Sequence, residues 1–450
     1  MQPSSKRSFT EGPILSRLMI MMLAVWVGMI SNIAVAFIDM IFLSYLEDLN
    51  VLAAIGFASS ILFITGSVGV GFSVATGVLV SQSLTRENQD SAGRWLTAIM
   101  ILALILSTLL CFALWPMLAS VLNALGAEAH IIPLAKDYLH IVLLSTPAAV
   151  LSMVLAASLR STAAAKASMI ASLVVAIVNL ALDPLFIFTF EWGLNGAAWA
   201  TVIARLVGLA VALWIVAVQK NLMRTINLTE WLEKLPGINK IAIPALLTNL
   251  FTPIGGLIVI YQLAQFGSEA VAGQALVGSI SPLLFAVFFS LTGAAGPIIG
   301  QNVGANQPER VWQVLKLGIR IIIVYSLVMW GVFALSYPAI IELYQVNGLA
   351  AELIRSFCYY QVPLMAGLGI LALSNAVFNN LDKAIYSTLF NGSRATIGTL
   401  LLCFVGGHFY GAVGVAVGAS LTLAVFGLAA GVTALKLYRK HYSNQLNKPT

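Results

Sequence analysis

Long apolar runs follow one another along almost the whole chain of 450 residues. Hydrophobic residues make up 60% of it and charged residues only 9%, a composition that a soluble domain of this size does not have. Inside a bilayer every backbone N–H and C=O must be bonded within the protein, and a run of about 20 apolar residues achieves this as a helix. The composition therefore predicts an all-α integral membrane protein.

The runs long enough to cross the bilayer number about twelve, six in each half of the chain. In the first half they lie near residues 16–44, 51–82, 93–115, 134–158, 165–190 and 194–217. In the second half they lie near residues 239–266, 269–301, 312–336, 353–378, 384–407 and 411–437. The three cysteines all fall inside these runs, far apart in sequence, so we expect neither a disulfide framework nor a metal site from them.

The two halves repeat each other. Residues 51–54 align with residues 270–273 at a shift of 219, and the same register pairs Ser60 with Ser279 and Gln82 with Gln301. Two pseudo-symmetric six-helix lobes are typical of transporters that work by alternating access. We predict an N-terminal lobe at 1–218, a charged cytoplasmic linker at 219–239 and a C-terminal lobe at 240–450.

The charges predict the orientation. With both termini in the cytoplasm, most of the 23 Lys and Arg fall on the cytoplasmic side, and only Lys136 and Arg355 lie outside. This asymmetry explains the net charge of +6 without nucleic acid as a partner. The chain has no nucleotide-binding loop and no hydrolase or metalloprotease motif, so we expect no cofactor and transport driven by a gradient.

Four ionisable residues fall at membrane depth: Asp39, Asp183, Arg205 and Arg394. Such residues are costly in lipid, so each is a functional candidate. Asn179 lies four residues before Asp183 and shares its helix face, and Thr201 adds a hydroxyl at comparable depth. Carboxylate, amide and hydroxyl oxygens suit a sodium ion, or a proton shared by the two carboxylates.

These oxygens occur in one half only, because the repeat places apolar residues at the equivalent positions of the second half. The asymmetry favours a functional site. The alternative is a buried ion pair of Asp39 or Asp183 with Arg205 or Arg394 that merely orients helices; a supporting charge is the role we expect for the two arginines.

Three stretches resemble the multidrug and toxic compound extrusion transporters, and within them the branch of the DNA-damage-inducible F proteins. They are Ile30-Ser31-Asn32-Ile33 leading to Asp39, Asn179 and Asp183 followed by residues 195–201, and Gly300-Gln301-Asn302-Val303-Gly304-Ala305 with Pro308-Glu309-Arg310. The resemblance covers nearly the whole chain.

The resemblance implies a two-lobed exporter in the bacterial cytoplasmic (inner) membrane that exchanges cationic or amphiphilic organic compounds for H⁺ or Na⁺. It implies a coupling role for Asp39 and a cation site at Asn179, Asp183 and Thr201. We expect a monomer without an obligatory protein partner. A flippase for a lipid-linked or other anionic cargo, and a membrane-embedded transferase, are the alternatives; no loop between the predicted spans is large enough to suggest the second.

Overall fold

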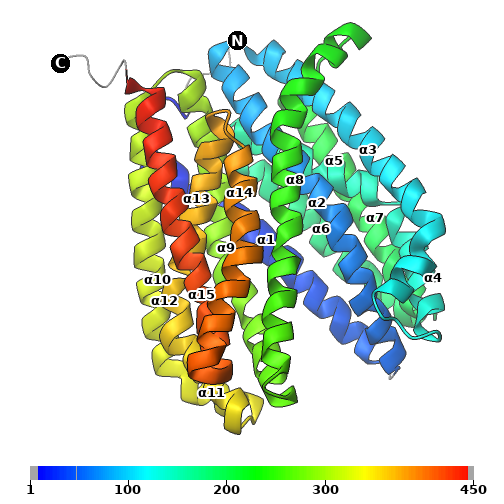
Figure 1. Cartoon of the computed structure of the whole chain (residues 1–450). Helices are drawn as coiled ribbons and strands as arrows, with labels where there is room; N and C mark the ends of the chain where they lie inside the picture. The colour runs from blue at the N-terminus through cyan, green and yellow to red at the C-terminus, as the bar shows by residue number, and fades with distance from the viewer. Residues whose placement is uncertain (1–8, 47, 444–450) are drawn as a thin grey trace. The chain divides into compact units, whose positions relative to one another are not determined.

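The computed structural model describes residues 9–46 and 48–443, and these residues are almost entirely helical (Figure 1). The elements of the first half are α1 (Ile14–Ser44), α2 (Leu49–Arg86), α3 (Gln89–Ala124), α4 (Ile131–Leu143), α5 (Thr146–Ser161), α6 (Ala165–Pro184), the π-helical turn η2 (Leu185–Thr189), α7 (Gly193–Trp214) and the π-helical turn η3 (Ile215–Gln219).

The second half begins with three long helices, continues with shorter pieces and ends with the long helix α15. The elements are α8 (Leu228–Ala264), α9 (Ser268–Gly304), α10 (Pro308–Tyr344), α11 (Gly348–Ser356), the π-helical turn η4 (Phe357–Gln361), α12 (Val362–Leu364), α13 (Ala366–Asn380), α14 (Ile385–Ser393), the π-helical turn η5 (Arg394–Gly398) and α15 (Thr399–His441).

Ten helical stretches of the described chain are long and apolar enough to cross a membrane. The bent pair α4 and α5 adds one more span. The longest stretch, Ile385–His441, contains two spans, because Tyr410 and Gly411 leave the helical conformation and Gly411 has a positive φ of 61° that suits glycine. The structure thus confirms the predicted all-α membrane fold with twelve spans, and the protein is an integral, multi-pass membrane protein.

The fourth predicted span, 134–158, is bent by 49° between α4 and α5. Pro147 causes the break, because it has no N–H to donate to the carbonyl of Leu143 one turn earlier. The thiol of Cys111 donates to that carbonyl instead, at 3.4 Å. Cys111 therefore compensates for the missing backbone donor.

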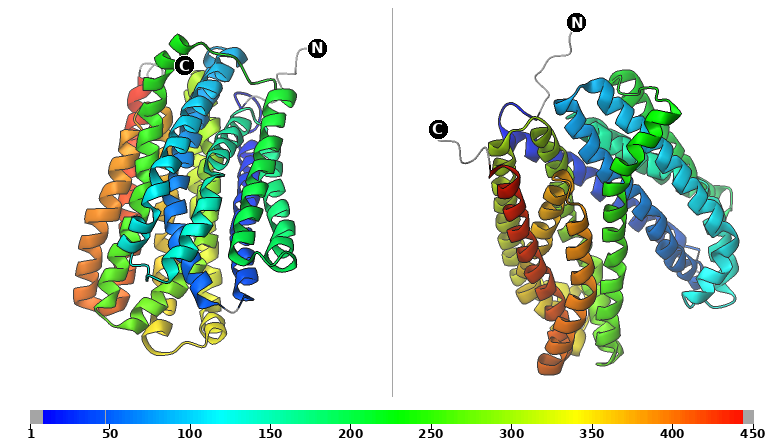
Figure 2. Two further views of the ribbon diagram at one scale, coloured as in Figure 1. Left: turned by 90° about the vertical axis from the view of Figure 1, so that its right-hand side faces the viewer. Right: turned by 45° about the horizontal axis from the view of Figure 1, so that its top comes forward.

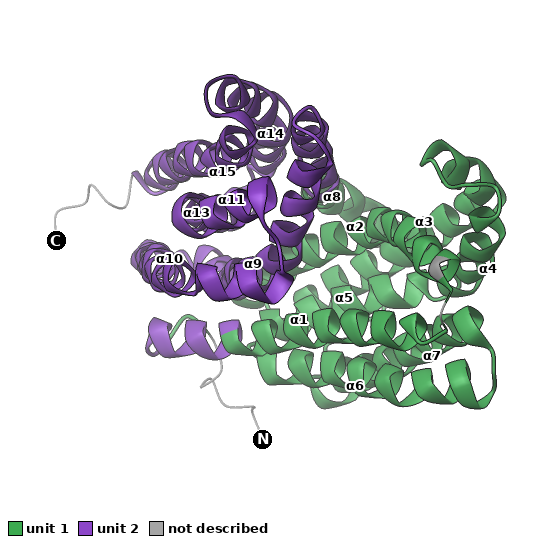
Figure 3. Cartoon of the chain, turned by 90° about the horizontal axis from the view of Figure 1, so that it is seen from below, with its two compact units in different colours: residues 1–11, 23–246 green, residues 12–22, 247–450 purple. Residues whose placement is uncertain are grey.

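The described chain forms two compact units, one of residues 23–246 with 1–11 and one of residues 247–450 with 12–22 (Figure 3). We predicted a linker at 219–239 between two lobes, whereas the boundary between these units falls inside α8, which is one unbroken helix, green in Figure 2. The first part of α8 belongs to the first unit because Ile238, Ile241 and Ala242 join its apolar core.

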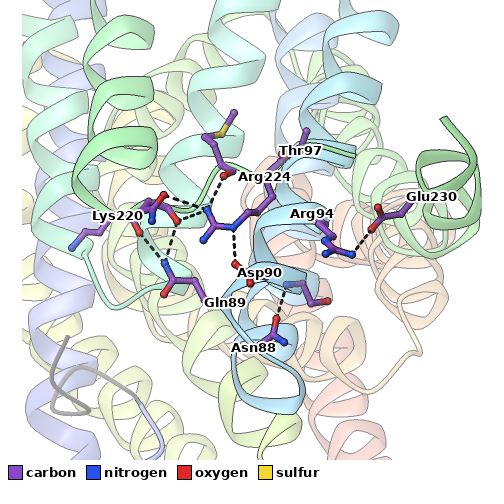
Figure 4. Close-up of polar contacts among 11 residues, drawn as sticks. Asn88, Gln89, Asp90, Arg94, Thr97, Lys220, Arg224 and Glu230 are labelled. Atoms are coloured by element: carbon purple, nitrogen blue, oxygen red, sulfur yellow. Dashed lines mark hydrogen bonds and ion pairs between the residues drawn. The ribbon is translucent and has the colours of Figure 1, made fainter. Parts of the chain in front are cut away.

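The segment 220–227, which follows η3 and precedes α8, is bound to the start of α3 (Figure 4). Arg224 Nε donates to Asp90 Oδ1 at 2.6 Å, and Gln89 Nε2 donates to the carbonyl of Lys220 at 2.9 Å. Thr97 Oγ1 donates to the carbonyl of Arg224 at 2.6 Å. Gln89 Nε2 also donates to the carbonyl of Asn221 at 3.2 Å. Side chains of α3 thus bind three backbone carbonyls of the segment, and Asp90 binds the Arg224 side chain.

We expect Arg224→Gln to loosen this segment. The ion pair with Asp90 is partly exposed, so its loss together with the hydrogen bonds should lower the free energy of local unfolding of the segment by about 1 kcal/mol. Proteolytic cleavage within 220–227 should therefore rise about fivefold. The control is Arg94→Gln, which removes a longer ion pair with Glu230, at 3.7 Å. Equal cleavage of the two variants would mean that Arg224 does not hold the segment.

Candidate functional site

A polar cavity of about 400 Å³ lies among the helices of the first unit. Its polar lining comes from Asn32 and Asp39 on α1, Tyr138 on α4, Ser152 on α5, Ser172 and Asn179 on α6, and Thr201 and Arg205 on α7. Small side chains, mostly alanine, make up much of the rest of the lining. Helices that are far apart in sequence therefore bring three of the four predicted oxygen donors, Asp39, Asn179 and Thr201, to one cavity.

The two carboxylates lie against each other. The side chains of Asp39 and Asp183 are within hydrogen-bonding range, and Asn179 Nδ2 donates to Asp183 Oδ1 at 3.5 Å. Asp183 is fully buried and Asn179 is 2% exposed, whereas Asp39 is half-buried and faces the cavity. Two ionised carboxylates this close repel each other, so the pair needs a proton or a cation between them.

Three oxygens of the pair and its neighbour lack a donor among the described residues. They are Asp39 Oδ1, Asn179 Oδ1 and Asp183 Oδ2. Buried oxygens without a donor are uncommon in native proteins, and each leaves a lone pair available. Together with the Thr201 hydroxyl, which lines the same cavity, they form a set of hard oxygen donors of the kind that a proton or a sodium ion binds.

Pro184 shapes the chain directly after Asp183. It ends α6, and the chain continues into the π-helical turn η2. A proline inside a helix removes a backbone donor, and π-helical turns occur often at functional sites. The helix therefore continues past Pro184 as a widened turn beside the carboxylate.

Arg205 lines the cavity and Arg394 does not. Arg205 Nη1 donates to Ser145 Oγ at 3.1 Å, at the break between α4 and α5. Arg394 belongs to η5 in the second unit, and its Nε has no acceptor among the described residues. Neither arginine forms an ion pair with Asp39 or Asp183 in the described part of the chain, so the alternative of a helix-orienting buried ion pair is wrong.

We did not predict Tyr138 as a site residue, and we named Asn32 only as part of a motif. Both line the cavity. Tyr138 stands next to Lys136 and Asp137, at the outer end of a predicted span, where a tyrosine ordinarily marks the membrane interface. The bend between α4 and α5 would have been the signal that Tyr138 is not an ordinary interface residue, but hydropathy does not reveal this bend.

The second unit has its own buried polar residues, and several of these bind one another. Asn391 Nδ2 donates to Asn375 Oδ1 at 3.2 Å, and Ser387 Oγ donates to Asn379 Oδ1 at 3.2 Å. Amides and hydroxyls satisfied in this way fix helix packing. The carboxylate pair belongs to the first unit alone, as the repeat predicted.

Apolar helices that cross a bilayer and enclose a polar cavity are the features of a multi-pass membrane transport protein. The chain matches the model of the MatE family over residues 20–185 and 244–405. It therefore belongs to this family, the multidrug and toxic compound extrusion transporters, whose members are transporters and not enzymes.

The relatives and solved structures that the chain resembles agree with this. It is 26% identical to the FAD transporter of Shewanella oneidensis over 431 residues, 94% of this chain and 95% of that protein. It is 26% identical to the multidrug export protein MepA of Staphylococcus aureus over 335 residues, 73% of each. The crystal structure of VcmN from Vibrio cholerae in its bent form has the same fold, with a TM-score of 0.89 and 24% identity over 95% of this chain and 98% of that one. Membership of the DNA-damage-inducible F branch stays a prediction.

Proposed function

We propose that this exporter is a secondary active antiporter that moves cationic or amphiphilic organic compounds out of the cell in exchange for H⁺ or Na⁺. Asp39 and Asp183 bind the coupling ion, and Asn179 and Thr201 supply further oxygens. The membrane is the bacterial cytoplasmic membrane, with both termini inside. The observation that carries the proposal is the pair of neighbouring carboxyl groups, each with one buried oxygen, Asp39 Oδ1 and Asp183 Oδ2, that has no donor among the described residues.

Ion binding would change the charge of this pair and with it the cost of burying the helices that carry it. A buried carboxylate without a partner costs several kcal/mol, which is enough to bias an equilibrium between two conformations. The ion would favour one orientation of the transporter and its release the other. This is the differential affinity that alternating access requires.

A second candidate is an exporter of anionic cargo, which includes the flippase alternative. Arg205 supports it, because this guanidinium lines the cavity and has a serine hydroxyl, not a carboxylate, as its described partner. The relative in Shewanella oneidensis is a transporter of FAD. Against it, the cavity also contains Asp39, which would repel an anion unless it is protonated or bound to a cation.

Everted membrane vesicles from cells without their own pumps test both candidates. An acid interior, or in a separate experiment a Na⁺-rich interior, should drive accumulation of a fluorescent cationic dye. In one-for-one exchange the dye can be concentrated at most by the concentration ratio of the coupling ion, so collapse of a gradient of one pH unit by an ionophore should lower the accumulation up to about tenfold. Dye uptake that is the same with and without either gradient would contradict antiport. Uptake of FAD and not of dye under the same gradient would support the second candidate.

A further inference from the structure

The second unit contains an apolar groove of about 470 Å³ at its surface. Met19 and Met22 of α1 line one wall, Val324 and Val328 of α10 line the other, and Arg320 stands among them. Val324 is 60% exposed and Val328 is 57% exposed, so the groove is open on the outside. In a membrane the occupant of such a groove is a molecule that is itself apolar over the length of the groove.

Arg320 is the one charged residue in the lining. It is exposed, and it has no ion-pair partner in the part of the chain that the structure describes. On α10 itself the carboxylates are Glu309 and Glu342, about 16 Å and 33 Å away along the helix axis. The only other polar group in the groove is the Tyr325 hydroxyl, and this donates to the Leu284 carbonyl at 3.2 Å. The guanidinium is thus available to an anion from outside the protein.

The groove has the length of one leaflet. Its lining on α10 runs from Leu317 to Val328, about 16 Å of helix, and the hydrocarbon of one leaflet is half of about 30 Å. Arg320 lies in the first turn of this stretch, toward the end of α10 that also carries Arg310 and Lys316. A basic side chain at that end lies where lipid headgroups are found, and the apolar remainder lies at the depth of acyl chains.

We propose that this groove is a specific site for one anionic phospholipid, with its headgroup phosphate on Arg320 and one acyl chain between α1 and α10. The guanidinium binds phosphate oxygens through paired N–H donors, which a zwitterionic headgroup matches less well because its own ammonium competes for them. The site is separate from the carboxylate cavity, which belongs to the first unit.

Native mass spectrometry of the purified full chain tests the proposal. The protein is incubated with equal amounts of phosphatidylglycerol and phosphatidylcholine with identical acyl chains. We expect wild type to retain one phosphatidylglycerol in preference to phosphatidylcholine. Arg320→Gln should lower the ratio of retained phosphatidylglycerol to phosphatidylcholine about fivefold. Arg320→Lys should keep part of the wild-type preference. Val324→Trp should fill the groove and lower retention of both lipids.

Two matched variants serve as controls. Lys436→Gln removes an exposed cation of α15, and Leu335→Trp enlarges a side chain of α10 that is 84% exposed; neither residue lines the groove. Both should behave as wild type, and all variants should elute as one monodisperse species. An unchanged lipid ratio in Arg320→Gln, equal retention of the two lipids by wild type, or full retention in Val324→Trp would each overturn the proposal.

Discussion

Asp39→Asn is expected to lose gradient-driven dye export, and Asp183→Asn to lose it as well. Asparagine has nearly the same shape as aspartate, but it can neither take up a proton nor offer a charged oxygen to a cation. If the carboxylate pair carries the coupling, dye accumulation by each variant should fall to the level that wild type shows after the gradient is collapsed, which is up to about tenfold lower for a gradient of one pH unit. The measurement is gradient-driven dye accumulation in everted vesicles at matched expression.

The control is Asp137→Asn. Asp137 lies on α4 next to the cavity residue Tyr138, but it is exposed and does not line the cavity. It should export as wild type does. The antiport mechanism is falsified if Asp39→Asn and Asp183→Asn both keep full gradient-dependent export, and the carboxylate pair would then be structural.

The sequence predicts the membrane spans well because a span is a local property. Each needs about 20 apolar residues, and hydropathy reads this directly. The division of the last 57-residue helical stretch is visible at Gly411, since the predicted spans 384–407 and 411–437 meet beside it. The break between α4 and α5 is harder to read, because both pieces are apolar and Pro147 alone marks it.

The carboxylate site could be predicted because ionisable residues at membrane depth are rare. Asp39, Asn179, Thr201 and Arg205 line one cavity, as the sequence indicated, and Asp183 lies buried beside Asn179. Arg394 could not be assigned in the same way. Depth in the membrane follows from sequence, but the direction of a side chain follows from helix rotation, and its turn η5 belongs to the second unit.

The lipid groove has no sequence signature at all. Its residues are ordinary apolar ones, and Arg320 is one of many cations assigned to the predicted cytoplasmic side. The groove is distinguished by the first part of α1, which belongs to the second unit although the rest of that helix belongs to the first (Figure 3). Contacts of this kind depend on the tertiary fold, and a hydropathy pattern carries no information about them.

The largest loss of stability is expected from Gly427→Ala, where α15 meets α13. A methyl group on Gly427 would lie 2.1 Å from the carbonyl oxygen of Gly367, and one on Gly367 would lie 2.3 Å from that of Leu423. These obstacles are backbone atoms, so no flexible side chain can move aside and the two helices must separate. Small residues permit such close approach in membranes, and overpacking costs about 1–3 kcal/mol or more.

Gly331→Ala is the matched control on α10, because a methyl group there meets nothing within 4 Å. Alanine replaces glycine inside a helix with a gain of about 0.5–1 kcal/mol, so this variant should melt at the wild-type temperature or slightly above it. Thermal melting followed by fluorescence-detected size-exclusion chromatography compares the three proteins. If Gly427→Ala melts together with Gly331→Ala, then α13 and α15 do not approach as closely as the structure has them, and the interior of the second unit is looser than its hydrogen-bonded asparagines indicate.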